Sequence, residues 1–318
     1  MKSIAIQDIQ GFHIGQAQDA DAATGCTVII NKKGAVCGVD VRGGSPGTRD
    51  TDALSPVMNR KVVHAIMLSG GSAFGLDAAG GVMRFLEEQR VGRDVGVTVV
   101  PNVCAAILFD LQCGHADVRP DAAMGYEACC AALSGQAFQS GCYGAGTGAT
   151  VGKSRGTAFA MKGGIGAAAF QIGELKIGAI AAVNCGGDVL ENGQIIAGAL
   201  DDNGIFAGSE SILLNGYRQY KDFFNGNTVL VCVITNADLD KAGATKAAQC
   251  GQNGIARCIR PAHTTFDGDT VFAMCSGDVE ATLDSVCILA ATATEAAIVD
   301  AVKKATGFGG YPSISDIT

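Results

Sequence analysis

Residues 225–235 read NGNTVLVCVIT, and this stretch decides how the rest of the chain is interpreted. From Thr228 to Thr235 every residue is apolar or β-branched, which is typical of a β-strand. The Asn-Gly pair at 225–226 is typical of a tight turn. The pattern alone therefore predicts a turn that leads directly into a strand.

The same stretch also allows a chemical interpretation, in which the protein cleaves its own Asn227–Thr228 bond. The Thr228 hydroxyl can attack the carbonyl that precedes it, and hydrolysis of the resulting ester would leave Thr228 as a new N-terminus. An α-amino group has an ordinary pKa of about 7.7–8.0, so it could act as general base for the hydroxyl of its own residue. A nucleophile at the first position of a rigid strand suits this chemistry.

The remaining pattern predicts a mixture of strands and helices. Two β runs, 26–31 and 34–42, are expected to form a hairpin through Lys32–Lys33. Strands do not alternate strictly with helices, so the chain is expected to be α/β with mixed sheets covered by helices and not doubly wound. The other expected β or apolar runs are 61–68, 95–100, 177–184, 228–235 and 269–275, and the expected helices are 72–90, 122–134, 239–256 and 279–304.

Composition excludes several classes of partner. The net charge is −8, from 23 basic and 31 acidic residues, so neither a nucleic acid nor an anionic membrane is expected to bind. Residues 1–14 do not resemble a signal peptide, and no window of about 18 residues resembles a membrane span. The 13 cysteines include no CxxC pair, so they are expected to be reduced, buried thiols in a cytoplasmic protein.

Two patterns resemble functional motifs without fitting their chemistry, and the histidines form no motif. Residues 43–47 match GxSxG, but Pro46 has no N–H for an oxyanion, so we interpret this stretch as a turn. Residues 144–149 read GAGTGA, a weak match to a dinucleotide fingerprint that lacks the acidic residue about 20 positions later. The four histidines, at 13, 64, 115 and 263, are too dispersed to predict a metal site.

Two aspartates, Asp267 and Asp269, flank Gly268 just before a predicted strand. They fit a solvated turn, and they also fit a carboxylate pair that orients an ammonium group or a hydroxyl. The pattern alone leaves both interpretations open.

Six features, in this order along the chain, resemble the L-aminopeptidase/D-esterase family, which includes β-peptidyl aminopeptidases and the nylon-oligomer hydrolase. The resemblance extends from about Asp8 to Gly307 and favours the scissile-bond interpretation over the turn. The features are Arg42-Gly43-Gly44, Ser69-Gly70-Gly71-Ser72-Ala73-Phe74-Gly75-Leu76, the loop from Gly144 to Lys153, Asn184 at a strand end, Asn227-Thr228, and Asp267-Gly268-Asp269.

The resemblance implies a single catalytic domain over residues 1–318. Its fold would be a four-layer αββα sandwich with mixed sheets, similar to ornithine acetyltransferases and, with different strand connectivity, to N-terminal nucleophile hydrolases. The precursor would be cleaved into an α chain, 1–227, and a β chain, 228–318, which stay together within a homotetramer. No cofactor and no metal is implied.

The resemblance also assigns roles to single residues. Thr228 would be the nucleophile, and Asn184 would donate its side-chain amide to the oxyanion. Lys153 would support the charge state of the nucleophile, while Asp267 and Asp269 would orient its hydrogen-bond network.

One position departs from the family pattern. Characterised members have a Tyr where this chain has Phe109. A Tyr hydroxyl there would help Asn184 to hold the oxyanion, and Phe cannot donate a hydrogen bond. The departure concerns the substrate more than self-cleavage, because the geometry at Asn227–Thr228 is local.

The expected function is therefore an N-terminal threonine aminopeptidase or amidase that acts on a small molecule or short peptide through an acyl-enzyme. An acyltransferase that passes the same acyl group to an amine is one alternative. An uncleaved, inactive relative that serves as a binding protein is the other, and Phe109 is its best support.

Overall fold

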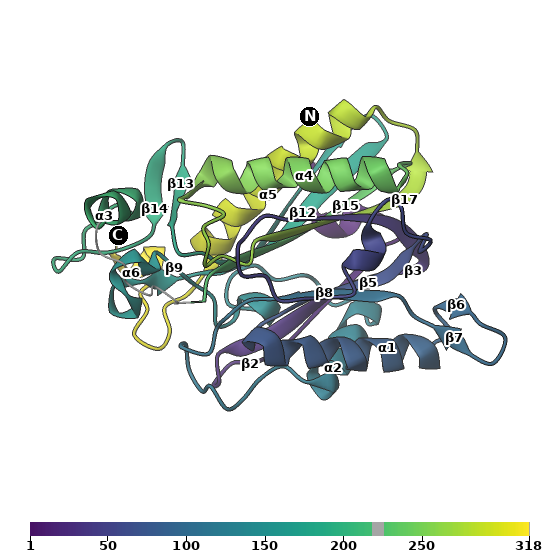
Figure 1. Ribbon diagram of the computed structural model, residues 1–318, viewed down its shortest axis with the longest axis horizontal. Helices are drawn as coiled ribbons and strands as arrows, with labels where there is room; N and C mark the ends of the chain where they lie inside the picture. The colour runs from purple at the N-terminus through teal and green to yellow at the C-terminus, as the bar shows by residue number, and fades with distance from the viewer. Residues whose placement is uncertain (218–225, 318) are drawn as a thin grey trace.

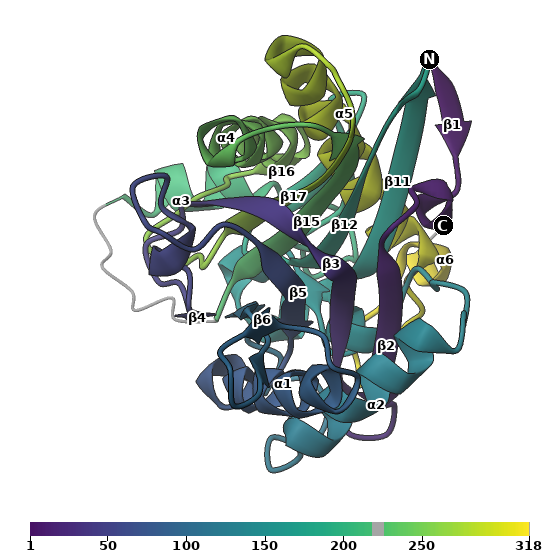
Figure 2. The ribbon, with the colours of Figure 1, turned by 90° about the vertical axis from the view of Figure 1, so that its right-hand side faces the viewer.

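A computed structural model describes residues 1–217 and 226–317 of the chain. Two β-sheets face each other, and a pair of helices covers the outer face of each sheet (Figure 1). The view turned by 90° separates the same helix pairs, with the N-terminal strand at the edge of the first sheet (Figure 2). The expected four-layer αββα arrangement with mixed sheets is confirmed.

The first sheet contains the predicted strand at Thr228. Its order is β1 (Lys2–Ile4), β11 (Gly164–Ile172), β12 (Leu175–Asn184), β15 (Thr228–Ala237), β17 (Thr270–Val279) and the second half of β3 (Thr24–Val41). β15 is antiparallel to β12 and parallel to β17, so it lies inside the sheet with a partner on each side.

The second sheet contains β2 (His13–Asp19), the first half of β3, β5 (Val63–Ser69), β8 (Val103–Ile107) and β4 (Thr48–Arg49). β5 and β8 are parallel, and the other pairs are antiparallel. The short strands outside these two sheets are β6 (Arg93–Asp94), β7 (Val99–Val100), β9 (Thr150–Val151), β10 (Met161–Lys162), β13 (Asp188–Glu191), β14 (Gln194–Ala197) and β16 (Ile259–Arg260).

The predicted hairpin at Lys32–Lys33 is wrong, because β3 is one continuous strand of 18 residues. Residues 24–30 pair with β2 and β5, whereas residues 36–41 pair with β17 in the other sheet. Between them the register with β5 shifts, and Gly34 has a φ of 81°, which glycine adopts without steric cost. The two lysines therefore mark a bend where the chain changes sheet without reversing. The strand predicted at 95–100 is likewise limited to β7.

The helices match the prediction more closely. α1 (Ala78–Glu88) and α2 (Ala122–Leu133) cover the second sheet, and α4 (Lys241–Cys258) and α5 (Leu283–Lys304) cover the first. Two short helices, α3 (Ser209–Asn215) and α6 (Ile314–Ile317), lie at the end of the molecule opposite β6 and β7 (Figure 1). α5 begins later than predicted because Val279 ends β17 and the Thr282 hydroxyl caps the helix by accepting from the Ser285 N–H.

By length and composition α5 could cross a membrane, but 61% of its most apolar window is buried inside the fold. It packs on β11, β12 and α4, so we interpret it as a core helix. The 13 cysteines are unpaired, and most of them are buried, as predicted for their side chains.

Alternation along β15 shows how the layers are held together. Val229, Val231 and Val233 face the α4–α5 layer, whereas Leu230, Cys232 and Ile234 face the second sheet. Each fully buried apolar side chain of this size contributes about 1.5–3 kcal/mol. Apolar contacts on both faces therefore fix β15 in position, and with it Thr228, the first residue of the strand.

Candidate active site

The structure brings all five residues predicted for catalysis to one end of the first sheet. Thr228 and Asn184 are register partners at the ends of β15 and β12. Asp267 and Asp269 belong to the loop that enters β17, the neighbour of β15 on its other side. Lys153 begins a short 3₁₀ helix after β9. All five are buried. Asn225, the first residue of the predicted turn, lies outside the described residues.

The carbonyl of Asn227 receives two hydrogen bonds. The Thr228 hydroxyl donates to its oxygen, and the backbone N–H of Gly268 donates to the same oxygen at 2.9 Å. A Cβ at position 268 would lie 2.6 Å from the Thr228 Oγ1 atom, so a side chain here would collide with the Thr228 hydroxyl. The bond predicted to be cleaved therefore has a hydroxyl beside it and a polarised carbonyl.

Asn184 is held at both ends of its side-chain amide. Its Oδ1 accepts from the Thr150 N–H at 2.9 Å and from the Lys153 Nζ at 3.1 Å. Its Nδ2 donates to the carbonyls of Phe109 and Gly226, each at 2.9 Å. In the intact chain the Asn184 amide thus contacts the carbonyl of Gly226, one residue before the carbonyl that we expect to be attacked.

Phe109 contributes to this network through its backbone. Its carbonyl accepts from Asn184, and its ring packs on Gly226, where a Cβ would fall 2.1 Å from the ring Cγ. The next residue, Asp110, accepts from the Gly71 N–H at 2.7 Å and anchors the segment to the Ser69–Leu76 motif. Burial raises the pKa of Asp110 to about 6.

Lys153 lies at the centre of the polar cluster. Its Nζ donates to both oxygens of Asn184, each at 3.1 Å, and to the carbonyl of Gly226 at 3.3 Å. Burial lowers the pKa of Lys153 to about 8, because removing the ammonium from water disfavours its charged form. At neutral pH the Lys153 amine is therefore neutral in a fraction of the molecules.

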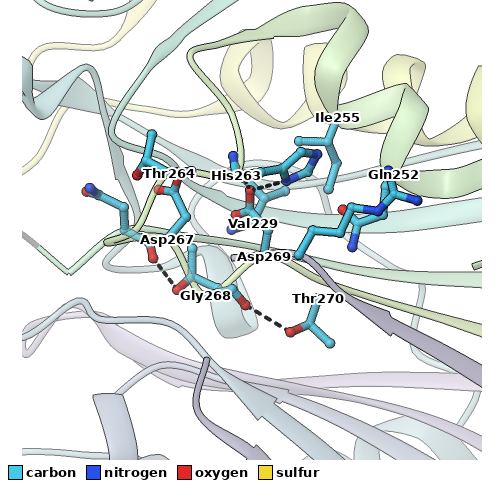
Figure 3. Close-up of polar contacts among 12 residues, drawn as sticks. Val229, Gln252, Ile255, His263, Thr264, Asp267, Gly268, Asp269 and Thr270 are labelled. Atoms are coloured by element: carbon cyan, nitrogen blue, oxygen red, sulfur yellow. Dashed lines mark hydrogen bonds and ion pairs between the residues drawn. The ribbon is translucent and has the colours of Figure 1, made fainter. Parts of the chain in front are cut away.

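The two aspartates have different partners. Asp269 accepts from the Val229 N–H at 2.8 Å through Oδ1, and through Oδ2 it contacts the Nδ1 of His263 at 2.9 Å (Figure 3). Asp269 therefore fixes the backbone next to Thr228. Asp267 accepts from the Thr264 N–H at 2.5 Å, which holds its own loop. Burial, followed by the nearby Asp269 charge, raises the pKa of Asp267 to about 6.

Sequence reasoning missed His263 as part of this site. The histidine lies six residues before its partner, in a loop whose path a pattern of residue types does not give. The only available signal was its presence in the same short segment as the two aspartates. His263 completes the contacts that hold Asp269 in place.

A cavity of about 200 Å³ opens beside Asn227. Its lining is mostly apolar or uncharged, and Lys153 is the only charged residue among the described residues that line it. The lining residues are Lys153, Ser154, Gly186, Gly187, Leu213, Asn227, Pro261, Thr264, Thr265 and Phe266.

The motifs rejected from the sequence have structural roles. The Ser45 N–H donates to the Asp267 carbonyl at 2.8 Å, and its hydroxyl donates to the Thr265 carbonyl at 2.9 Å, so the GxSxG stretch supports the aspartate loop. The GAGTGA stretch packs in the interior, where the Ala145 N–H donates to Thr27. No group of His, Cys, Asp or Glu side chains within residues 1–217 and 226–317 could hold a metal ion.

Comparison with known proteins agrees with this fold. The model of peptidase family S58 matches residues 5–313. An uncharacterized aminopeptidase of Mycobacterium leprae is 40% identical, over 87% of this chain and 80% of that protein. The 6-aminohexanoate-oligomer endohydrolase of Paenarthrobacter ureafaciens is 29% identical, over 86% of this chain and 75% of that protein.

Two solved structures share the architecture. The L-aminopeptidase D-Ala-esterase/amidase of Ochrobactrum anthropi, described as a variant of the Ntn hydrolase fold, superposes with a TM-score of 0.72 and 18% identity. That match covers 97% of this chain and 88% of the other. A Burkholderia sp. β-aminopeptidase gives a TM-score of 0.70 and 20% identity, over 98% and 92% of the two chains.

Proposed function

Because this chain belongs to peptidase family S58, whose relatives are aminopeptidases and amide hydrolases, we propose that Thr228 is its nucleophile, first for cutting the Asn227–Thr228 bond and then for substrate amides. One observation carries the proposal. The Thr228 hydroxyl donates a hydrogen bond to the carbonyl oxygen of Asn227, and the Gly268 N–H donates to the same oxygen. Nucleophile, electrophile and a donor for the developing oxyanion are thus already together.

Self-cleavage needs two steps. First, the Thr228 Oγ forms an ester with the Asn227 carbonyl carbon, the C–N bond breaks, and the hydroxyl proton is transferred overall to the Thr228 nitrogen. Water then hydrolyses the ester, which leaves a carboxylate on Asn227 and a free amine and hydroxyl on Thr228. No outside reactant other than water is required.

The fold supports a product whose two chains remain together. In the β chain, β15 pairs with β12 of the α chain along Thr228–Thr235, and β17 pairs with β3 along Thr270–Cys275. The two β-chain strands also pair with each other, and α4 and α5 cover them. Separating the chains would expose buried apolar surface on both faces of the sheet, at a free-energy cost of about 25 cal/mol for each Å² exposed.

Substrate hydrolysis follows from the groups left after cleavage. The α-amino group of Thr228 accepts the hydroxyl proton as the Oγ attacks the substrate carbonyl. Before cleavage the Asn184 Nδ2 donates to the Gly226 carbonyl. Once cleavage has separated residues 226–227 from Thr228, this amide can donate to the substrate oxyanion, and Lys153 keeps it oriented. The amine product leaves, and water releases the acid from Thr228. The substrate is a small amide or short peptide, and the relative that hydrolyses 6-aminohexanoate oligomers supports an amide bond as the target.

Trapping the acyl-enzyme tests this proposal. The purified protein is mixed with alanine p-nitroanilide, quenched in acid within one turnover, and each chain is weighed by mass spectrometry. We expect one alanyl group on the 228–318 chain. Adding excess amine distinguishes hydrolysis from acyl transfer, since a transfer product that outcompetes free acid would contradict the hydrolase. An acyl group on residues 1–227 would rule out Thr228 as the nucleophile.

A further inference from the structure

In the intact chain the Asn227 carbonyl lies beside the Thr228 hydroxyl, as a substrate carbonyl would when Thr228 attacks it. The inference drawn from this position rests on the function proposed above. In self-cleavage the acyl group on Thr228 Oγ is the chain that ends at Asn227. In substrate hydrolysis it is the substrate's acyl residue, bound to the same oxygen. Each ester places an acyl carbonyl carbon on the same Thr228 oxygen, so the side chain next to that carbon is expected in the same region of space in both.

We propose that the Asn227 side chain occupies the pocket that later binds the side chain of the substrate's acyl residue, and that Gly186 sets the width of this pocket. The pocket would take an amino-acid acyl group with an uncharged side chain. The bond that is cleaved is the amide bond between the carbonyl of this acyl group and the leaving amine.

The position of Asn227 supports the first part of this proposal. Its side chain is buried, and it forms part of the wall of the 200 Å³ cavity. Its Oδ1 has no hydrogen-bond partner among the described residues. The residues around Asn227 therefore bury its side chain at the edge of this cavity without binding its amide oxygen, as expected of a site that accommodates volume and not one polar group.

Gly186 faces this side chain directly. A Cβ at position 186 would lie 2.6 Å from the Asn227 Nδ2 and 2.9 Å from its Cγ, and the three nearest atoms all belong to Asn227. The backbone at Gly186 is fixed, because its carbonyl accepts from the Lys153 N–H at 3.0 Å. Its φ lies outside the left-handed region, so alanine would add bulk to the pocket without straining the chain.

The chemistry of the lining supports an uncharged acyl side chain. Leu213, Pro261 and Phe266 supply apolar surface, and Thr264 and Thr265 supply hydroxyl-bearing side chains. The described lining residues include no Asp or Glu, and the Lys153 amine is bound to Asn184 and Gly226. A cationic substrate side chain would therefore be buried beside the Lys153 amine with no carboxylate from the described lining to pair with it, which is strongly unfavourable.

Self-cleavage rates test the pocket without any added substrate. Three variants are compared with the wild type: Gly186→Ala, Asn227→Gly, and both together. We expect Gly186→Ala to slow self-cleavage by roughly tenfold to 100-fold, because overpacking displaces the Asn227 side chain. Removing that side chain should relieve the collision, so the double variant should cleave at the rate of Asn227→Gly alone.

The mature double variant then tests substrate choice, with Asn227→Gly as its matched control, since the two differ only at residue 186. We expect the kcat/KM ratio of leucine over alanine p-nitroanilide to fall by about tenfold in the double variant. Lysine p-nitroanilide should be a poorer substrate than the leucine compound for both proteins.

Each contrary result has a distinct meaning. Gly186→Ala cleaving at the wild-type rate, or a double variant as slow as Gly186→Ala, would overturn the role of Gly186. Lysine p-nitroanilide turned over as fast as the leucine compound would overturn the assigned substrate class. A wild-type chain that never cleaves, or a Thr228→Ala chain that still does, would instead refute the function on which the inference rests.

Discussion

Replacing Asn184 with alanine should separate the two reactions that we propose for this protein. In the intact chain the Asn184 Nδ2 contacts the carbonyl of Gly226, whereas the carbonyl of Asn227 receives the Gly268 N–H. Of the Asn184 side-chain hydrogen bonds that the variant loses, only the one to Gly226 lies in the segment that is cleaved, so self-cleavage should slow by about 1 kcal/mol, or about fivefold in rate. Substrate hydrolysis loses an oxyanion donor, worth about 2.7–4 kcal/mol, or about 100-fold to 1000-fold in kcat.

The assay measures both rates on the same preparation. The appearance of the 228–318 chain is followed by mass spectrometry, and the hydrolysis of alanine p-nitroanilide is normalised to the amount of that chain. Asn236→Ala is the matched control, because Asn236 lies at the opposite end of β15 and also accepts and donates backbone hydrogen bonds, at 2.8 and 2.9 Å. Its loss should lower stability without separating the two rates.

Two results would refute this reasoning. Equal losses in both reactions would mean that Asn184 also holds the oxyanion of self-cleavage. Alternatively, the variant could hydrolyse substrate within about threefold of the wild-type rate, a much smaller loss than removal of an oxyanion donor causes. Asn184 would then bind neither the oxyanion of self-cleavage nor that of substrate hydrolysis.

Three further predictions follow from the site. Gly268→Ala should slow self-cleavage by about 100-fold or more on a timed gel, because its Cβ would lie 2.6 Å from the Thr228 Oγ1 atom; a wild-type rate would exclude this close contact. Asp269→Asn should slow self-cleavage roughly tenfold to 100-fold and lower the melting temperature, because an amide leaves at least one buried N–H donor of Val229 or His263 unpaired, at about 1–3 kcal/mol; an unchanged rate and melting temperature would contradict this. The pKa of Lys153 is lowered to about 8 in the fold, so the unfolded chain binds more protons above pH 8, and the contribution of Lys153 to stability should rise with pH between 8 and 10.5 by up to about 3 kcal/mol. Urea unfolding of the Thr228→Ala chain with and without Lys153→Met would measure this difference, and parallel pH profiles would contradict it.

The sequence predicted the elements whose pattern is local. The run of apolar and β-branched residues after Thr228 identified β15, and the long apolar stretch before Lys304 identified α5. The bend of β3 was missed, because Lys32–Lys33 looks the same in a turn as in a strand that changes sheet. Which sheet a strand pairs with is decided by distant partners, here β5 and β17.

The candidate site shows the same limit. Motif residues such as Asn184 and Asp269 could be named from the sequence, but their partners could not. The Asn184 amide contacts Gly226 and Phe109, and Asp269 contacts His263, through folding that brings separate loops together. The position of the Phe109 carbonyl likewise depends on the anchor between Asp110 and Gly71, which no spacing reveals.

The most direct test of the central claim is the intact mass of the purified protein beside its Thr228→Ala variant. We expect the wild type to yield two chains, of which the smaller, with 91 of the 318 residues of a 32.2 kDa protein, weighs about 9 kDa and begins with Thr228. The variant should remain at full length, because alanine has no hydroxyl to attack the Asn227 carbonyl. Full-length protein in both preparations after long incubation, or the same two fragments in both, would contradict the claim that Thr228 is a self-cleaving nucleophile.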